Sequence, residues 1–409
     1  MESEPPKSMK SFLVMFIGQV FSWIGSKLVQ FALVWWLTES TGSASVLAFA
    51  SIMAVIPEVF LSPIAGVMVD RWNRRHVMMA ADAFVAAVTV LLMVINIQGM
   101  MEVWHIYTVM FIRAMGAAFH WAAMQASTTL MVPKNQLSRT AGLFQSLGGF
   151  SMIVAPPLGA YLLAVMDLQV ILAIDVITAA MAIAPLVFIN MPQPKILVKK
   201  KGVRSVFEDM AETVKYVLQW RGILYVGVIA MMINLLIAPA VSLMPILVTG
   251  YFNGGANDYA FMQSGLGVGM VIGGITLGLW GGFKKGIITG LVALVLCGVG
   301  IAGVGLMPPD MFNYAVASLF FAGFMLPISN GSFFAVMQST VPPEMQGRFF
   351  TLVSAMSTAM NPIGLIFAGP ATDVIGVTVW YIIGGVGMVI LGLLAIFVPT
   401  VRNIEEQFN

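Results

Sequence analysis

The sequence predicts an all-α integral membrane protein with twelve transmembrane helices in two six-helix halves. Apolar residues make up 59% of the chain and charged residues only 9%, which leaves too little polar surface to cover a soluble protein of 409 residues. The apolar residues gather in twelve continuous runs, each close to the roughly 20 residues that a helix needs to cross a bilayer. These runs lack period-2 alternation, so they are predicted to be helices rather than barrel strands.

The predicted spans follow one another with short polar breaks, except between the sixth and the seventh. Their ranges are 11–37, 45–69, 77–97, 103–131, 139–166, 168–190, 222–250, 258–282, 286–306, 311–340, 347–370 and 376–400. We expect no cleavable signal peptide, because the first span is too long for a signal h-region and eleven more spans follow it.

The basic residues predict the topology. Of the twenty Lys and Arg residues, only Lys27 and Arg113 lie deep within spans, and all others fall in or at the edge of one alternate set of breaks. The other set carries only acids, which are Glu39, Glu102, Asp167, Asp258, Asp310 and Asp373. Because positively charged loops stay cytoplasmic, we expect both termini on the cytoplasmic side of a plasma (bacterial inner) membrane. Topology thus explains the basic residues, and we expect no nucleic-acid partner.

The chain divides once, into an N-terminal half (1–191), a cytoplasmic linker (192–221) and a C-terminal half (222–409). The linker is the only long polar stretch, and apolar residues recur at helical spacing at Val206, Met210 and Val214. This pattern fits either an amphipathic helix on the membrane surface or a plain connection. The halves echo each other in AAMQAS and AVMQST, each followed by a VP dipeptide. Two such halves in one orientation are typical of parallel-repeat transporters.

Sequence signals for catalysis are weak. The chain has three His and one Cys, and it contains no HExxH, paired CxxC or GxSxG motif. We therefore expect no enzyme activity, no cofactor and no metal site. The glycine-rich run at 265–274 lies inside a span, where glycines four residues apart predict close helix packing. Two such series are Gly265, Gly269 and Gly273, and Gly274, Gly278 and Gly282.

The loop after the second span carries the strongest local motif, Gly66-Val67-Met68-Val69-Asp70-Arg71-Trp72-Asn73-Arg74-Arg75. It resembles the loop signature of the major facilitator superfamily, G-x-x-x-D-R-x-x-R-[RK]. The resemblance implies that the two halves surround a central cavity. It also implies that Gly66, Asp70, Arg71, Arg74 and Arg75 form a conformational lock, in which Asp70 engages the N-terminus of the eleventh span near Arg348. Gly282 stands at the acid's place in the second half, so we expect the lock on one side only.

Over its whole length the chain resembles the macrolide efflux pumps of that superfamily's third drug:proton antiporter group. The residues that carry this resemblance are LTESTGSASVL, FIRAMGAAFH, AIDV, YFNGG and NPIGLI. The resemblance implies proton-coupled export of hydrophobic or amphipathic, macrolide-like drugs by alternating access. Lysophospholipid flippases and siderophore exporters of the same group remain alternatives. The implied partners are a small hydrophobic substrate, protons and the lipid bilayer, and we expect a monomer.

Ionisable residues within the spans are the candidates for proton coupling, because charge in a membrane is costly and usually functional. All six lie in the first half: Lys27, Glu58, Asp82, Arg113, His120 and Asp175. We expect Glu58, Asp175 and His120 to couple protons, and Lys27 and Arg113 to complete a charge network with them. The alternative is that these groups only tie helices together. Asp82 is close enough to the start of its span to brace the arginines of the 66–75 loop instead.

Neutral polar residues are predicted to complete a substrate cavity. In the first span Gln19, Ser26 and Gln30 form one stripe on a helical wheel. The second half contributes Asn234, Asn330, Gln338 and Asn361, together with Met232 and Met337. Methionine gives a soft surface that adapts to bulky ligands, although most of the 32 Met residues are equally explained as membrane filler.

Overall fold

The computed structural model describes residues 9–69, 71–133, 136–189, 191, 221–341 and 343–406. Within these ranges twelve helices have 20 residues or more. They are α1 (Met9–Thr41), α2 (Ala44–Val69), α3 (Arg74–Ile97), α4 (Val103–Met131), α5 (Leu137–Val165), α6 (Leu168–Phe188), α8 (Arg221–Ser242), α10 (Ala256–Trp280), α11 (Gly286–Leu306), α12 (Phe312–Thr340), α13 (Pro343–Ile375) and α14 (Thr378–Phe397).

Each predicted span corresponds to one of these helices. Eleven of them are long and apolar enough to cross a membrane. The twelfth, α4, is 29 residues long, but its hydropathy is lower because Arg113 and His120 lie within it. The predicted fold class, an all-helical multi-pass membrane protein, is therefore confirmed.

Two helices end at places that the sequence pattern did not predict. The seventh span was predicted as one run over 222–250, but α8 ends at Ser242 and is followed by α9 (Met244–Ile246) and the π-helical turn η2 (Leu247–Tyr251). Pro245 at the start of α9 cannot donate a backbone hydrogen bond to the preceding turn, which explains the break. Conversely, α13 continues through Pro370 to Ile375, beyond the predicted end of the eleventh span. A short α15 (Pro399–Arg402) and η3 (Ile404–Glu406) follow α14.

The chain forms two compact units. Unit 1 comprises Met1–Trp36 and Met53–Val206, and unit 2 comprises Leu37–Ile52 and Phe207–Asn409. The segment 37–52, where α1 ends and α2 begins, therefore belongs with the second unit by its contacts. The linker predicted over 192–221, with its amphipathic helix, lies outside the described residues except for Arg221, where α8 begins.

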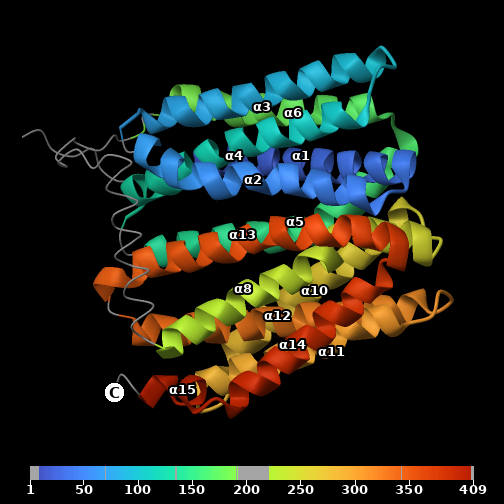
Figure 1. Cartoon of the computed structure of the whole chain (residues 1–409). Coiled ribbons are helices and arrows are strands. Elements are labelled where there is room, and N and C mark those ends of the chain that lie inside the picture. The colour runs from blue at the N-terminus through green and yellow to red at the C-terminus, as the bar shows by residue number, and fades with distance from the viewer. Residues whose placement is uncertain are drawn as a thin grey trace, which may run out of the picture. The chain divides into compact units, whose positions relative to one another are not determined.

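In unit 1, α3 packs against both α4 and α6 (Figure 1). Small residues allow the close contacts: Gly18 and Gly25 of α1 face α6, and Gly116 of α4 faces Val85 of α3. A buried apolar cluster fills one end of the unit with side chains from all six helices, among them Phe12, Met78, Met124, Leu147 and Leu186. This cluster fixes the spacing of the helices whose polar residues lie farther along the unit.

In unit 2, α11 packs against both α12 and α14, and α10 packs against α12 (Figure 1). Helix α8 contacts α13 and α14, and the Tyr381 hydroxyl of α14 donates a hydrogen bond of 2.6 Å to the Ala240 carbonyl of α8. Glycine lets the backbones touch, as where Gly385 of α14 meets Ala302 of α11. The contacts thus follow the small-residue packing that is usual for helices in lipid.

Asp373 of α13 binds the turn between α1 and α2, at the N-terminus of α2, within unit 2. Its carboxylate accepts hydrogen bonds from the backbone amides of Ala44 (2.8 Å) and Ser45 (3.2 Å), and from the hydroxyls of Ser43 and Ser45. These amides are free donors at the start of α2, so a carboxylate from a distant helix caps this terminus. Gly369, one turn earlier in α13, allows close approach to Ala48.

Asp373→Ala is expected to loosen this turn. Loss of a helix cap costs about 0.5–2 kcal/mol, so segment 37–52 should open more often. The measurement is the rate of thiol labelling at Ala44→Cys, a buried position, in a Cys297→Ser background. Asp310→Ala, an exposed loop acid in the same unit, is the control. Equal labelling with and without Asp373 would mean that helix packing alone holds the turn.

Candidate functional site

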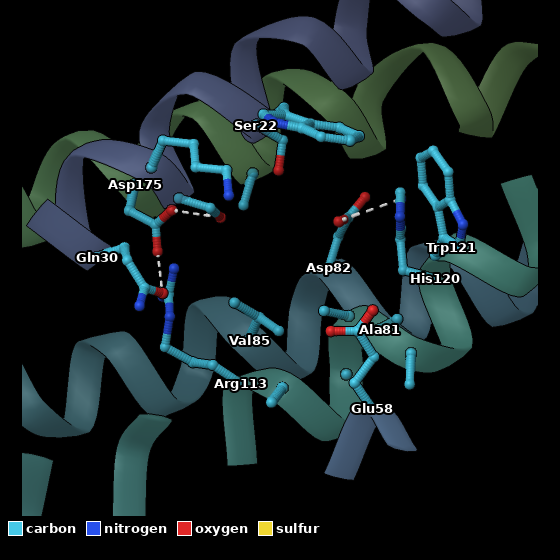
Figure 2. A pocket seen from close by; sticks show the side chains of 18 of the residues that line it. Ser22, Gln30, Glu58, Ala81, Asp82, Val85, Arg113, His120, Trp121 and Asp175 are labelled. Atoms are coloured by element: carbon cyan, nitrogen blue, oxygen red, sulfur yellow. Dashed lines mark hydrogen bonds and ion pairs between the residues drawn. The ribbon is translucent and has the colours of Figure 1, made fainter. Parts of the chain in front are cut away.

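Unit 1 contains a cavity of about 380 Å³ between its helices (Figure 2). Side chains from α1, α2, α3, α4 and α6 line it. All six ionisable residues that the sequence analysis placed within spans are among them, namely Lys27, Glu58, Asp82, Arg113, His120 and Asp175. These residues come from five different helices, and the fold brings them to one cavity.

Arg113 and Asp175 form an ion pair on one side of the cavity (Figure 2). Arg113 Nη1 lies 2.5 Å from Asp175 Oδ2, and the Asp175 side chain is 2% exposed. The Ser26 hydroxyl donates to Asp175 Oδ1 at 3.1 Å. Thr89 Oγ1 lies 3.1 Å from Asp175 Oδ2 and accepts a hydrogen bond from Arg113. The carboxylate thus has charged and neutral donors on its two oxygens.

Asp82 and His120 lie together on the other side (Figure 2). His120 Nε2 is 3.5 Å from Asp82 Oδ1, and it has no hydrogen-bond partner in the part of the chain that the structure describes. The Gln19 amide donates to Asp82 Oδ2 at 3.3 Å. Asp82 therefore faces the cavity, and its partners are Gln19 and His120 rather than the arginines of the 66–75 loop.

Lys27 and Glu58 line the same cavity without pairing. Neither side chain forms an ion pair or a side-chain hydrogen bond among the described residues, and both are exposed. The predicted charge network therefore consists, in this structure, of the direct contact between Arg113 and Asp175 and of the electrostatic attraction between Lys27 and Glu58, which do not touch.

The neutral residues predicted for the first half also line this cavity: Gln19, Ser26 and Gln30. Two tryptophans that the sequence analysis did not select stand beside them. The rings of Trp23 and Trp121 meet edge to face with centroids 5.5 Å apart. Trp23 lies four residues after Gln19, so the helical stripe that selected Gln19 could have found it. Thr89 was likewise missed, although it lies seven residues after Asp82 and so on the same helix face.

Unit 2 contains a smaller cavity of about 180 Å³, lined mostly by apolar side chains. Of the residues predicted for this half, Asn234, Asn330 and Met337 line it. Met232, Gln338 and Asn361 are not among its lining residues. Four phenylalanines from α12 and α13 form much of the wall: Phe333, Phe334, Phe349 and Phe350. The wall of this cavity carries no ionisable side chain among the described residues, in contrast to the cavity of unit 1.

The 66–75 segment connects α2 to α3. Arg74 is buried and donates to the Ala126 carbonyl of α4 at 2.9 Å, and Arg75 donates to the Val187 carbonyl of α6 at 2.5 Å. Gly66 lies in α2 with open space at its Cβ position, and Arg71 is exposed. Asp70 lies outside the described residues. Two of the predicted lock residues therefore hold the loop to helices of their own unit.

Long apolar helices around a cavity lined by ionisable groups are typical of a membrane transporter, and comparison with known proteins identifies the family. The chain belongs to the major facilitator superfamily, whose family model matches residues 15–365. The protein is accordingly a transporter and not an enzyme.

Bacterial efflux proteins resemble the chain over nearly its full length. Macrolide efflux protein A of Streptococcus pyogenes is 32% identical over 394 residues, covering 96% of this chain and 97% of that protein. The multidrug efflux pump Tap of Mycolicibacterium fortuitum is 23% identical, covering 93% of this chain and 94% of the pump.

Solved structures of transporters share the fold at low sequence identity. The xylose transporter XylE from E. coli has a TM-score of 0.70 at 14% identity, covering 97% of this chain and all of that one. A bacterial homologue of the iron transporter ferroportin has a TM-score of 0.74 at 13% identity, covering 95% of this chain and 99% of that one. At these identities the likeness concerns the fold alone.

Proposed function

We propose that this transporter is a proton-coupled exporter of hydrophobic or amphipathic drugs, macrolide-like in kind, that works by alternating access. One observation carries the proposal: six ionisable side chains line a single cavity within membrane-spanning helices. Keeping charge there is costly, and it is usual where a protein moves ions or protons. The names of the macrolide and multidrug efflux relatives support the substrate class.

The exporter is proposed to work as a monomer in the plasma (bacterial inner) membrane with both termini cytoplasmic. The topology is proposed because basic and acidic residues occupy alternate sets of breaks between the spans. Its partners are then the drug, protons and the surrounding lipid. The proton-coupling groups are Glu58, His120 and Asp175, with Lys27 and Arg113 as the compensating charges.

The 66–75 segment is proposed as a conformational lock between inward-facing and outward-facing states. Arg74 and Arg75 support this role, because their hydrogen bonds to α4 and α6 fix the loop at the start of α3. In this proposal the carboxylate of Asp70 binds a helix N-terminus in one state of the cycle.

Transport by the purified protein in liposomes with an imposed pH gradient tests the proposed function. A radiolabelled macrolide should move against its concentration gradient only while the pH gradient lasts, and a protonophore should stop it. Fluorescent lysophospholipid and a siderophore are the comparison substrates. Movement of the lysophospholipid without the macrolide would favour a flippase, and movement that ignores the pH gradient would exclude proton coupling.

Glu58→Gln is expected to stop proton-driven efflux while leaving substrate affinity nearly unchanged. The substitution keeps the shape of the side chain and removes a carboxyl that has no ion-pair partner among the described residues. Efflux rate under a pH gradient and equilibrium drug binding are measured side by side. Glu39→Gln, an exposed acid near the end of α1, is the control. Efflux at the wild-type rate in the Glu58→Gln protein would transfer the coupling role to other acids of the cavity.

A further inference from the structure

Two carboxylates are buried in the cavity of unit 1, and their partners differ in kind. Asp175 contacts a guanidinium, which stays charged at every accessible pH, and two hydroxyls. Asp82 contacts the amide of Gln19 and the imidazole of His120, whose charge depends on a proton. The same residue type therefore stands in two electrostatic settings within one cavity.

Asp175 is poorly suited to carry a proton. A proton on its carboxyl would leave the Arg113 guanidinium without a counter-charge, and the arginine side chain is only 12% exposed. An unpaired buried charge is costly, so the loss of this ion pair opposes protonation of Asp175. The hydroxyls of Ser26 and Thr89 also bind the ionised oxygens, and these hydrogen bonds would weaken.

Asp82 and His120 have the opposite property. Asp82 is 9% exposed at its side chain, and with a neutral imidazole its charge has no cationic partner in direct contact. One added proton neutralises the pair, whether it resides on the carboxyl or on the imidazole. The distance of 3.5 Å between His120 Nε2 and Asp82 Oδ1 is longer than a normal hydrogen bond, so these two atoms are close but not hydrogen-bonded. A proton on Nε2 would convert this contact into a charge-assisted bond.

Other charges face this pair from the helices around the cavity. They are Lys27 of α1, Glu58 of α2, Arg113 of α4 and Asp175 of α6. Arg113 and Asp175 compensate each other through direct contact. Lys27 and Glu58 are of opposite sign and add no net charge. The sum of these neighbours is neutral, so the proton count of Asp82 and His120 decides the charge of the cavity.

We propose that Asp82 and His120 form the proton-binding pair of this cavity, taking up one proton between them, while Asp175 is a fixed charge that positions Arg113. The proposal rests on the proposed proton-coupled transport and assigns its proton to a site. It adds Asp82 to the coupling residues and makes Asp175 a positioning residue. No bond other than that to the proton forms or breaks.

Histidine NMR on the full-length protein in lipid nanodiscs tests the pair without any need for transport. The chain has only three histidines, His76, His105 and His120, and His120→Gln identifies the signal of interest. Asp82→Asn should lower the ratio of protonated to neutral His120 at a given pH by about tenfold, because an adjacent anion favours the imidazolium. Asp310→Asn, an exposed acid in unit 2, should leave the ratio unchanged.

Two further observations make the test decisive. Asp175→Asn should change the His120 ratio much less than Asp82→Asn does. Unaltered signals from His76 and His105 in each variant show that the protein is folded. An unchanged ratio in the folded Asp82→Asn protein would overturn the pair. An equal change in the Asp82→Asn and Asp175→Asn proteins would also overturn it, because His120 would then respond to the whole cavity.

A liposome assay separates this proposal from the proposed function. Asp82→Asn should abolish drug efflux driven by a pH gradient but retain exchange of drug across the membrane at equal pH. Loss of both activities in the folded variant would overturn the coupling role of Asp82. If the wild-type protein moved no drug under a pH gradient, the proposed function would fail, and the histidine measurement would still decide whether Asp82 and His120 share a proton.

Discussion

Arg113→Ala is expected to abolish transport and to lower the stability of unit 1 by about 3–5 kcal/mol, the usual cost of removing one partner of a buried ion pair. The loss leaves Asp175, with a side chain 2% exposed, without its cation. Thr89 also loses the hydrogen bond that its hydroxyl accepts from Arg113. The effect should exceed that of Glu58→Gln, because Glu58 has no ion-pair partner to lose among the described residues.

A graded series separates charge from geometry. Arg113→Lys keeps the positive charge but replaces Nη1, the guanidinium nitrogen that donates to both Thr89 and Asp175, with the ammonium of a differently shaped side chain, so an intermediate result is expected. The combination Arg113→Met with Asp175→Leu removes both charges and should recover most of the stability but none of the transport. Thermal unfolding of the purified protein and efflux in liposomes are the two measurements.

Lys284→Ala is the matched control, because Lys284 is exposed and forms no ion pair among the described residues. A double variant as unstable as Arg113→Ala would contradict the explanation by an unpaired buried charge. An Arg113→Ala protein with normal stability and normal efflux would show that Asp175 finds another partner.

Most of the fold could be predicted from the sequence, because hydrophobic length and charge placement are constraints that a membrane imposes directly. The exceptions involve proline. Pro245 interrupts the seventh span, whereas Pro370 lies within α13 and does not end it. Whether a helix continues past a proline depends on tertiary partners for the freed backbone groups, which a single sequence does not specify.

The candidate site could be predicted in part. Helical phase selected the residues of α1, α2 and α4 that line the cavity, since a membrane helix buries its few polar side chains together. The contacts between these charged residues were harder to predict from the sequence than the residues themselves. Asp82 was one of six candidates, with contact to the arginines of the 66–75 loop as its alternative, and the sequence did not indicate that its partners come from α1 and α4. Which acid meets which base depends on helix rotation and depth, and these are set by packing between helices.

The glycine pattern of α10 likewise does not indicate which face of the helix packs against a neighbour. Both series of glycines four residues apart were predicted to serve close packing. Gly269 and Gly273 of α10 do face the backbone of α12, at Phe320 and Phe324. Gly274 and Gly278 face open space, and Gly282 lies beyond the helix with φ +86°. The prediction was therefore wrong for the second series, because one helix has one face against α12 and spacing alone does not indicate which.

Gly273→Ala is accordingly expected to destabilise unit 2 strongly, whereas Gly274→Ala should be neutral or slightly stabilising. A Cβ at Gly273 would overlap the carbonyl oxygen of Phe324, and backbone atoms cannot rotate away as a side chain can. Helices α10 and α12 must then separate, which costs at least the roughly 1–3 kcal/mol typical of overpacking. At Gly274 nothing lies within 4 Å, so the higher helix propensity of alanine, worth up to about 1 kcal/mol, acts alone.

Thermal unfolding in detergent, with Gly278→Ala as a second open-space variant, measures the difference. Gly273 and Gly274 are adjacent in sequence and share the same helix, so general effects of alanine on α10 cancel between them. Gly269→Ala should behave like Gly273→Ala, because its Cβ would overlap the Phe320 carbonyl. Equal melting temperatures for the Gly273→Ala and Gly274→Ala proteins would mean that α10 and α12 can part without loss, and that the close backbone contact does not stabilise this unit.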